Sequence, residues 1–276
     1  HTPYATQNQS IRHQLDFGIR LLDVRIQVAQ DGSRYTFTTC HGDIGSDHGI
    51  NLYQSLPSLL GECRDFLGRN PSEVVLLSLK VDDWSNTKSR QEALAALQDL
   101  LNEYPVKTAA SLPTLGTTRG HIFLFNRIND DLALGTPISW SDNTTGSYAK
   151  ASSNRGYPVY VQDRYKDLPT VGADAEKLRL VIAAFDHKPS SAVVWNFASA
   201  TWYGVFGVYI QGDLLSYFGK DEAADRLENF GWTLFDYPFS SYDTTTYGSM
   251  NIVSLIISSN FGYLGYEKKF KVLGEG

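Results

Sequence analysis

Short apolar runs alternate along this chain with longer segments in which apolar residues recur every three or four positions. The short runs predict strands, because they are rich in β-branched and aromatic residues. The longer spacing, as in the leucines from Leu52 to Leu67, predicts amphipathic helices. The strands are predicted to begin near residues 19, 35, 74, 121, 158, 192 and 232, and the helices to cover 11–17, 52–67, 89–104, 173–187, 213–230 and 249–260.

This alternation indicates an α/β fold, since strands separated by helices form parallel sheets with helical crossovers. A chain of 276 residues fits one α/β barrel. We therefore predict a single domain over residues 1–276. An eight-stranded barrel needs one strand more than the seven predicted, and the missing strand would end where the chain starts at His1. The predicted barrel is thus incompletely closed.

Polar side chains stand at the ends of six of the predicted strands. The carboxyl ends of barrel strands build the active site in this architecture, so we expect these side chains to meet at one mouth. The alternative for each residue alone is a solvated lysine or an aspartate that caps the next helix. The six residues are Arg25, His41, Lys80, Arg127, Asp163 and Asp236.

Asp23 and Arg25 lie in an otherwise apolar run, two positions apart, and so on one face of a strand. Burying an acid and a base is costly unless they are paired or used. Two interpretations stay open, a structural ion pair and a functional one.

Charge and composition exclude some classes of function. The net charge is −6 and no run of Lys or Arg stands out, which argues against nucleic acid as a partner and against tight electrostatic docking on anionic membranes. No apolar run reaches the roughly 20 residues of a membrane span. The two cysteines, Cys40 and Cys63, are either one disulfide or two buried thiols.

The predicted strand-end residues suggest metal-free cleavage of a phosphodiester. Arg25, Lys80 and Arg127 are suited to a phosphate or to vicinal hydroxyls, and His41 is suited to acid–base work near neutral pH. Tyr165 is suited to covering a sugar-like ring. We predict no metal and no cofactor, because no compact spacing of metal ligands occurs around His41 and Arg25 would oppose a cation.

Three segments resemble a known family, the X-domain of bacterial-type phosphatidylinositol-specific phospholipase C. They are Gln14–Arg25, Cys40–Gly42 and Phe66–Lys80, and later segments around Gln162, Trp195 and Phe235 fit the same family. The resemblance covers most of residues 11–237. It implies a distorted, incompletely closed TIM barrel that cleaves phosphatidylinositol into diacylglycerol and inositol 1,2-cyclic phosphate, with cleavage of glycosylated forms left open.

The resemblance also implies roles for individual residues. His41 is similar to the general acid, and Arg25 to the arginine that binds phosphate in the metal-independent branch, with Asp23 in the motif beside it. Asp236 matches the carboxylate that orients a second catalytic histidine. The residues similar to those that contact inositol are Lys80, Arg127, Asp163 and Tyr165.

The second histidine, the general base, is the departure from the family pattern. The family has a Gly-Thr/Ser-His-Asp/Asn-Ser/Thr motif at the end of its first strand, whereas this chain opens with His1 followed by Thr2. Either His1 is the base without its usual acidic or amide neighbour, or His1 stands at the next motif position and the base precedes it.

An aromatic stretch after the strand at 192–197 suggests contact with a membrane surface. Trp202, Tyr203 and Phe206 would favour the lipid interface if they lie on the barrel rim; the alternative is ordinary packing. We expect a secreted monomer that acts transiently on membranes containing phosphatidylinositol. Two rivals are an inositol-phospholipid binder without turnover and a metal-dependent glycerophosphodiesterase-like barrel, against which Arg25 counts.

Overall fold

The structure, a computed structural model, forms two compact units. The N-terminal unit comprises Ser10–Ser139 and Ala151–Tyr157, and the C-terminal unit comprises His1–Gln9, Trp140–Lys150 and Pro158–Gly276. Each is described here by itself, and the prediction of a single domain stays a prediction. The described residues are 7–42, 50–109, 112–128, 135–144, 147–149, 159–187, 193–200, 206–218, 230–238 and 252–260.

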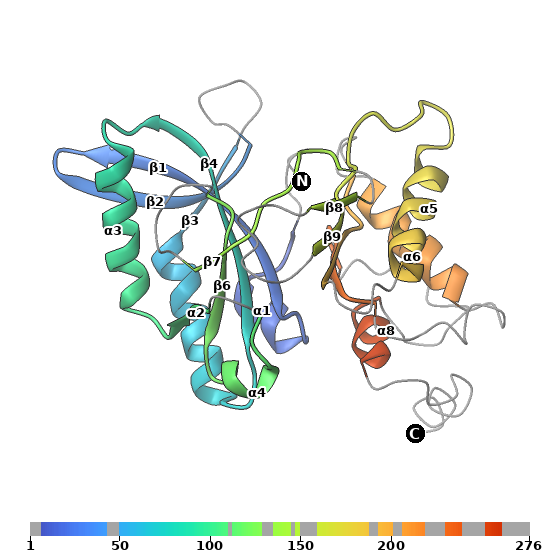
Figure 1. The fold of residues 1–276 in the computed structure, drawn as a ribbon, viewed down its shortest axis with the longest axis horizontal. Helices are drawn as coiled ribbons and strands as arrows, with labels where there is room; N and C mark the ends of the chain where they lie inside the picture. Colours follow the sequence, from blue (N-terminus) through green and yellow to red (C-terminus); the bar gives the residue numbers. More distant parts are fainter. Residues whose placement is uncertain are drawn as a thin grey trace. The chain divides into compact units, whose positions relative to one another are not determined.

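The N-terminal unit is built on one mixed sheet with the strand order β3-β2-β1-β4-β6-β5, and β7 pairs with β6. Strands β1, β4, β6, β5 and β7 run parallel to their neighbours within this group, as the alternating sequence predicts. Figure 1 shows this sheet with its helices. The strands are β1 (Leu21–Asp31), β2 (Arg34–His41), β3 (Ile50–Ser55), β4 (Val75–Asn86), β5 (Val106–Lys107), β6 (Ile122–Asn126) and β7 (Thr136–Pro137).

The prediction that every strand is parallel is wrong for β2. It pairs antiparallel with β1 through a two-residue connection between Asp31 and Arg34, and β3 pairs antiparallel with β2. Gly32 in that connection has a φ of 59°, a value that glycine adopts without steric cost and that tight hairpins require. A hairpin of this kind needs no helical crossover, so helix–strand alternation could not reveal it.

Helices α2 (Leu56–Arg69) and α3 (Arg90–Asn102) begin where a serine caps them. The Ser55 and Ser89 hydroxyls accept hydrogen bonds from backbone N–H groups of the first turn, which satisfies donors that have no partner within the helix. The cap at Ser55 explains why α2 starts later than predicted, because residues 50–55 belong to β3. Helices α1 (Ile11–Asp16) and α4 (Leu115–Thr118) complete this unit.

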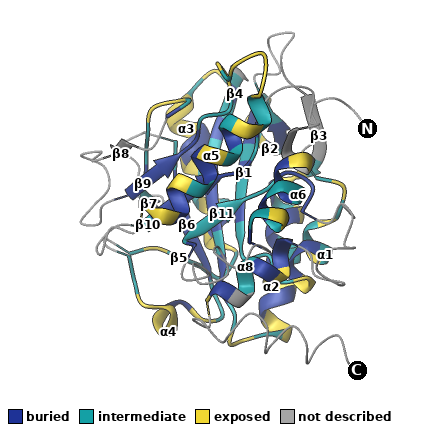
Figure 2. Ribbon diagram, turned by 90° about the vertical axis from the view of Figure 1, so that its right-hand side faces the viewer, coloured by how far each residue is buried: buried dark blue, intermediate teal, exposed yellow. Residues whose placement is uncertain are grey.

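The hydrophobic core of the N-terminal unit lies between the sheet and helices α2 and α3. It takes alternate residues from the strands, such as Leu22, Val24 and Ile26 of β1. The leucines of the two helices pack against these side chains, so each helix is buried along one face and exposed along the other (Figure 2). Because strand side chains alternate, residues 23 and 25 of β1 point to the opposite face of the sheet.

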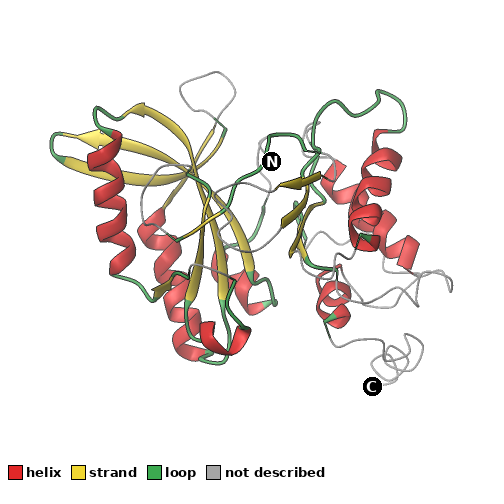
Figure 3. Ribbon diagram, in the orientation of Figure 1, coloured by secondary structure: helices red, strands yellow, loops and turns green. Residues whose placement is uncertain are grey.

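The C-terminal unit carries a second sheet, with the order β11-β10-β9-β8. Strands β9, β10 and β11 are parallel, and β8 is antiparallel to β9. Figure 3 shows these strands with helices α5, α6 and α8. The elements are β8 (Ser147–Ala149), β9 (Val159–Gln162), α5 (Ala173–Asp186), β10 (Val193–Phe197), α6 (Phe206–Phe218), β11 (Trp232–Leu234) and α8 (Ile252–Ser259).

The predicted helix over residues 213–230 is wrong in its start. Helix α6 begins at Phe206, so the last of the three aromatic residues predicted to contact a membrane is the first residue of this helix. Residues 219–229 lie outside the described ranges. The core here is rich in aromatic rings, and Phe185, Phe218 and Phe230 pack with centroids 4.5–5.8 Å apart.

None of the helices in the described ranges has both the length and the apolar character needed to cross a membrane.

Candidate active site

Strands β1 and β4 place a row of polar side chains on the sheet face away from α2 and α3. Their parallel register sets Asp23 opposite Ser78 and Arg25 opposite Lys80. All four side chains therefore project to one face, because they occupy alternate positions of adjacent strands. The prediction that Arg25 and Lys80 stand at strand ends is wrong, since β1 and β4 continue past them.

Asp23 is the centre of this row. Its Oδ1 accepts a hydrogen bond of 2.6 Å from the Ser78 hydroxyl and one of 2.8 Å from Arg127 Nη1, while its Oδ2 lies 3.6 Å from Arg25 Nε. Burial opposes ionisation of this carboxyl, but the charges of Arg127 and Arg25 and the hydrogen bond from Ser78 outweigh burial and lower its pKa. Asp23 is thus a carboxylate that holds two arginines.

Arg127 reaches Asp23 because β6 ends beside β4. The last residue of β6 pairs with Leu79, and the Arg127 N–H donates to the Leu79 carbonyl. The prediction that Arg127 directly follows a strand is confirmed. Its side chain is only 9% exposed, so its ion pair with Asp23 is largely shielded from water.

Asp82 is a second acid in the row, and the sequence analysis missed it. Its carboxylate lies 2.9 Å from Lys80 Nζ and 3.4 Å from Arg25 Nη1, and its side chain is 6% exposed. The signal was available in the sequence, because Ser78, Lys80 and Asp82 alternate by two. The predicted strand stopped at Lys80, so this alternation was not followed further.

A bulge in β4 turns one more acid toward this part of the sheet. The register between β1 and β4 shifts between Ile26 and Gln27, so Gln27 lies opposite Asp83. Gln27 Nε2 donates to Asp83 Oδ2 at 3.0 Å, and both side chains are buried. Bulges bend strands and re-aim side chains and are common near active sites.

The arrangement on this face can bind an anion. We call Arg25, Lys80, Arg127, Asp23 and Asp82 the cationic cluster, because ion pairs link its three positive groups to its two carboxylates. Asp83, the further acid, lies beyond these residues along the sheet and is held by Gln27. The contacts of Arg25 to both carboxylates, at 3.6 and 3.4 Å, are longer than charge-assisted hydrogen bonds usually are. A phosphate oxygen would compete effectively for this guanidinium.

His41 is the last residue of β2, as predicted, and it pairs with Ile50 of β3. Its neighbour Cys40 lies on the other side of the strand and is buried. Burial, together with the charges of Asp82 and Asp83, raises the pKa of the Cys40 thiol to about 12. These charges place the end of β2 near the acidic residues of β4. Cys40 and Cys63 are free thiols, which decides between the two possibilities left open by the sequence.

In the C-terminal unit, Asp163 directly follows β9, as predicted. Its Oδ2 accepts a hydrogen bond of 2.7 Å from the indole N–H of Trp140, and its own N–H donates to the Thr144 carbonyl at 2.9 Å. Trp140 and Thr144 come from a stretch in which no strand or helix was predicted. Their roles were missed because an indole that reaches into another segment leaves no periodic pattern.

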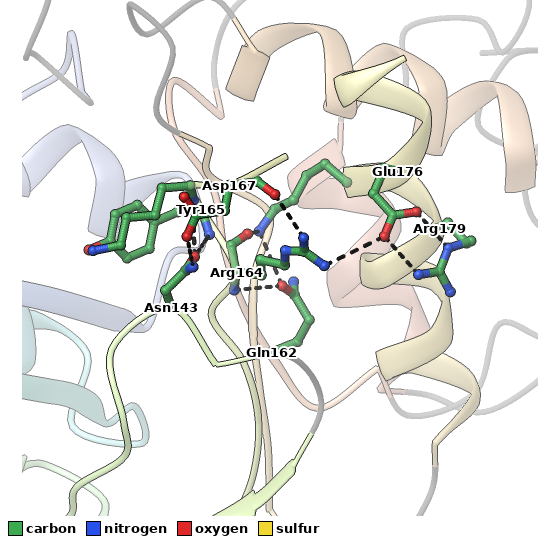
Figure 4. Close-up of polar contacts among 9 residues, drawn as sticks. Asn143, Gln162, Arg164, Tyr165, Asp167, Glu176 and Arg179 are labelled. Atoms are coloured by element: carbon green, nitrogen blue, oxygen red, sulfur yellow. Dashed lines mark hydrogen bonds and ion pairs between the residues drawn. The ribbon is translucent and has the colours of Figure 1, made fainter. Parts of the chain in front are cut away.

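Tyr165 is held by the same stretch. Its hydroxyl donates to the carboxylate of Asp142 at 2.8 Å, and Asn143 Oδ1 accepts from its N–H at 3.0 Å (Figure 4). Burial, then the hydrogen bond and charge of Asp142, raise the pKa of the Tyr165 hydroxyl. Lys166 Nζ also contacts Asp142, at 2.9 Å. The ring of Tyr165 is therefore fixed by contacts at both its backbone and its hydroxyl.

Asp236 was predicted to end a strand, but β11 ends at Leu234, two residues before it. Gln211 of α6 donates through Nε2 to the backbone carbonyls of Asp236 and Tyr237. Tyr237 has a φ of 49°, a strained value for a bulky side chain. Burial raises the pKa of the Asp236 carboxyl to about 7, although the charge of Lys177 acts in the opposite direction.

The structure links four of the predicted residues: Asp23 contacts Arg25 and Arg127, and Lys80 is joined to Arg25 through Asp82. Asp163, Tyr165 and Asp236 belong to the other unit, and the predicted meeting of all of them at one mouth stays a prediction. His1, Trp202 and Tyr203 lie outside the described residues, and Phe206 is described only as the first residue of α6.

Within the described ranges, no three His, Cys, Asp or Glu side chains are grouped so that they could hold a metal ion. The predicted absence of a metal or cofactor stays a prediction that an experiment must test.

Comparisons with known proteins give several matches. The family model PI-PLC X matches residues 1–117. The 1-phosphatidylinositol phosphodiesterase of Staphylococcus aureus (strain Newman) is 26% identical over 279 residues, which are 92% of this chain and 81% of that protein. The protein of the same name from Listeria monocytogenes is 30% identical over 126 residues, which are 44% of this chain and 35% of that protein.

Solved structures give the same result. A variant of the phosphatidylinositol-specific phospholipase C from S. aureus matches with a TM-score of 0.75 at 25% identity, covering 93% of this chain and 84% of that one. The enzyme from L. monocytogenes matches with a TM-score of 0.58 at 22% identity, covering 93% and 84%. The predicted fold class, a distorted α/β barrel, and the predicted family resemblance are confirmed by these matches.

Proposed function

We propose that this chain, a relative of the bacterial phosphatidylinositol-specific phospholipases C, cleaves phosphatidylinositol by histidine acid–base catalysis without a metal. The products would be diacylglycerol and inositol 1,2-cyclic phosphate. The observation that carries the proposal is the cationic cluster, whose Asp23, Arg25 and Lys80 lie within the part of the chain that matches the family model. The S. aureus relatives, named as phosphodiesterases of this lipid, support the same reaction.

Charge is the first requirement of this reaction, because negative charge builds up on the phosphoryl oxygens in the transition state. Donors fixed in advance at those oxygens stabilise the transition state more than the ground state. Asp23 and Asp82 hold Arg25 in place from two sides without neutralising all of the cluster's positive charge. We assign Arg25 to the phosphate, and Lys80 and Arg127 to inositol hydroxyls.

Proton transfer is the second requirement. We assign His41 as the general acid that protonates the diacylglycerol oxygen as it leaves. The general base would take the proton from the inositol 2-hydroxyl, whose oxygen then attacks phosphorus. In the C-terminal unit Gln7 Nε2 donates to the Phe235 carbonyl at 2.8 Å, directly beside Asp236. This contact supports a base from the segment before Gln7, oriented by Asp236, and we assign it to His1.

Recognition of inositol is the third requirement. We assign Asp163 and Tyr165 to it, the carboxylate as a hydrogen-bond acceptor for hydroxyls and the ring as a stacking surface. Both side chains are held by hydrogen bonds from the stretch around Trp140 and Asn143. Such fixed geometry reduces the ordering cost of binding.

The decisive experiment measures release of water-soluble inositol phosphate from phosphatidylinositol vesicles in the presence of EDTA. We expect turnover by the wild type in EDTA and a loss of about 100-fold or more in His41→Ala, since general acid catalysis contributes on that order. His121→Ala is the matched control, because this histidine directly precedes β6, its ring contacts the Arg119 carbonyl, and it has no assigned role. Its rate should equal that of the wild type.

Three other outcomes would contradict the proposal. Loss of turnover in EDTA with recovery on adding calcium would favour a metal-dependent glycerophosphodiesterase-like enzyme. Inositol binding without turnover would favour a binding protein. Equal rates in His41→Ala and the wild type would remove His41 from the mechanism. The same assay on a glycosyl-phosphatidylinositol tests whether glycosylated forms are cleaved.

We further propose that the chain is secreted and acts as a monomer at a membrane surface. A solved structure of the S. aureus enzyme concerns the modulation of its membrane binding, which supports a peripheral role. Trp202 and Tyr203 remain the candidate interfacial residues, with Phe206. Trp202→Ala should lower activity on vesicles more than on a soluble inositol phosphodiester, and equal losses on both would reject the interfacial role.

A further inference from the structure

Lys177 is a fully buried lysine that the proposed reaction does not use. It is 0% exposed and lies on α5, on the same helix face as the buried residues Leu180, Val181 and Ala184. Lysine is almost never fully buried unless its ammonium group has partners, and desolvating such a group costs several kcal/mol in proteins. A lysine at an apolar position of an amphipathic helix therefore needs an explanation in its contacts.

The contacts of Lys177 lie on both sides of Asp163. Lys177 Nζ donates to Gln162 Oε1 at 3.2 Å and to the Arg164 carbonyl at 2.6 Å. Gln162 Oε1 also accepts a hydrogen bond of 3.0 Å from the Arg164 N–H (Figure 4). The backbone at Asp163 is thus held on both sides by the Lys177 ammonium group and the Gln162 side-chain amide.

These contacts belong to a network that returns to α5. Gln162 Nε2 donates to Asn196 Oδ1 and to the Phe197 carbonyl, both at 2.9 Å. Asn196 Nδ2 in turn donates to the Val181 carbonyl at 3.0 Å. The network therefore joins α5, β9 and β10 through three side chains that are each at most 1% exposed. Buried polar networks in which the groups find partners give a segment one defined geometry.

Charge supports the same role. Burial lowers the pKa of the Lys177 ammonium group, whereas the negative charges of Asp163 and Asp236 raise it and the charge of Arg164 lowers it. Asp163, the acid assigned to inositol, stands on the segment that Lys177 contacts on both sides.

We propose that Lys177 is a positioning residue that fixes the Gln162–Arg164 turn and thereby sets the inositol-binding geometry of Asp163 and Tyr165. The proposal rests on the function proposed above and adds a residue to it. Lys177 touches no substrate in this scheme. It acts through the backbone of the turn, so its loss should weaken recognition of inositol more than the chemical step.

The test compares Lys177→Met with Arg179→Met. Both remove one positive charge from α5, but Arg179 is exposed and pairs with Glu176 on the surface of the same helix. Phosphatidylinositol in detergent micelles gives KM and kcat, and titration calorimetry with myo-inositol gives a dissociation constant. For Lys177→Met we expect both KM and this constant to rise about 10-fold or more, because a misaligned hydrogen bond between inositol and the Asp163 carboxylate loses about this much affinity. We expect kcat to fall less than about threefold, and Arg179→Met to match the wild type.

The outcomes separate the two proposals. If the wild type cleaves phosphatidylinositol and Lys177→Met has unchanged KM and inositol affinity, only the role of Lys177 is overturned. A lower folded fraction with unchanged KM would assign Lys177 to stability alone and also overturn it. If the wild type neither cleaves the lipid nor binds inositol, the proposed function fails and this inference fails with it.

A second variant covers the case in which Lys177→Met does not fold. Lys177→Gln keeps an amide donor at the same position but is too short to reach the Arg164 carbonyl in the same way. The expected and overturning results are the same as for Lys177→Met. Lys177→Arg, which keeps both charge and donors, should recover part of the inositol affinity, and a variant no better than Lys177→Gln would count against a donor role.

Discussion

At the residue scale, Asp23 is the side chain on which the cationic cluster most depends. Asp23→Asn keeps an acceptor for Ser78 but removes the charge that holds Arg127 and Arg25. Removing one partner of a largely buried ion pair costs about 3–5 kcal/mol, and the partial exposure of Arg25 reduces this to about 2–4 kcal/mol of unfolding free energy here. Urea denaturation at pH 7 measures the loss, and lipid cleavage should fall with it.

Asp65→Asn is the matched control for that substitution. Asp65 pairs with Arg64 on the surface, where both side chains are more than half exposed. Exposed pairs contribute about 0–1 kcal/mol, so the control should barely change the midpoint. If both variants lose the same unfolding free energy, the ion pairs of Asp23 stabilise the fold no more than the exposed Asp65–Arg64 pair does. The lowered pKa of Asp23 also predicts a dependence on pH. The contribution of Asp23 to stability is present above pH 3.8, the ordinary pKa, and is lost as the pH falls through the pKa of the folded state.

At the element scale, the entry to β11 depends on one glycine. Gly231 has a φ of 68°, and a Cβ there would lie 2.7 Å from Val194 Cβ and 2.9 Å from the Val194 carbonyl oxygen. Gly231→Ala should therefore lower the unfolding free energy by about 3 kcal/mol or more, through backbone strain and overpacking together. Because β11 leads to Asp236, we also expect lower activity.

Gly32→Ala isolates the backbone part of that effect. Gly32 has a similar φ of 59° but would place its Cβ in open space. We expect a loss of about 1–2 kcal/mol, the cost of a left-handed conformation for a residue with a Cβ. Urea denaturation compares the two variants, and equal losses would show that the contact with Val194 relaxes at no cost.

The same scale shows what the sequence could predict. Long periodic helices such as α3 and α5, and short buried strands such as β6, were placed within a few residues, because apolar spacing follows directly from burial on one face. The antiparallel β2 was misjudged, since its direction depends on the turn at Gly32 and leaves no mark on apolar spacing.

For the site, the sequence identified the ionic residues but not their partners. Asp23, Arg25, Lys80 and Arg127 were named before the structure, because charges within or after apolar strands stand out. Asp82 and Lys177 were missed for opposite reasons. Asp82 lies beyond a strand end that was drawn too early, and Lys177 sits in a helix where lysines are normally taken as solvated. Partners of this kind depend on tertiary contacts between distant segments.

At the scale of the whole molecule, two buried titratable groups, Lys177 and Asp236, should shape the dependence of stability on pH. Burial lowers the pKa of Lys177 from 10.5 to about 7. The charges of Asp163 and Asp236 raise this pKa, and the charge of Arg164 lowers it further. Between pH 7 and 10.5 the unfolded chain holds a proton that the folded chain has released, so stability rises with pH in this window. The raised pKa of Asp236, about 7 instead of 3.8, has the opposite sign, and stability falls from pH 4 to 7.

Lys177→Met tests this sign. The unfolding free energy of the wild type minus that of Lys177→Met should rise by about 1–3 kcal/mol between pH 7 and pH 9. Only the wild type gains stability from releasing that proton. Urea titrations at several pH values measure the difference. Parallel stability curves for the two proteins over this range would show that Lys177 titrates alike in the folded and unfolded chains.

The two free cysteines give the N-terminal unit two built-in reporters of local opening. Cys40 in β2 and Cys63 in α2 are buried, and each thiol has a pKa of about 12, raised first by burial. Because the thiolate is the reactive form, a disulfide reagent near pH 8 can label either residue only after the surrounding structure opens. The labelling rate of each cysteine therefore reports how often its own strand or helix opens, with no probe added to the protein. A ligand held by the cationic cluster should lower the labelling rate of Cys40, whereas Asp23→Asn should raise it.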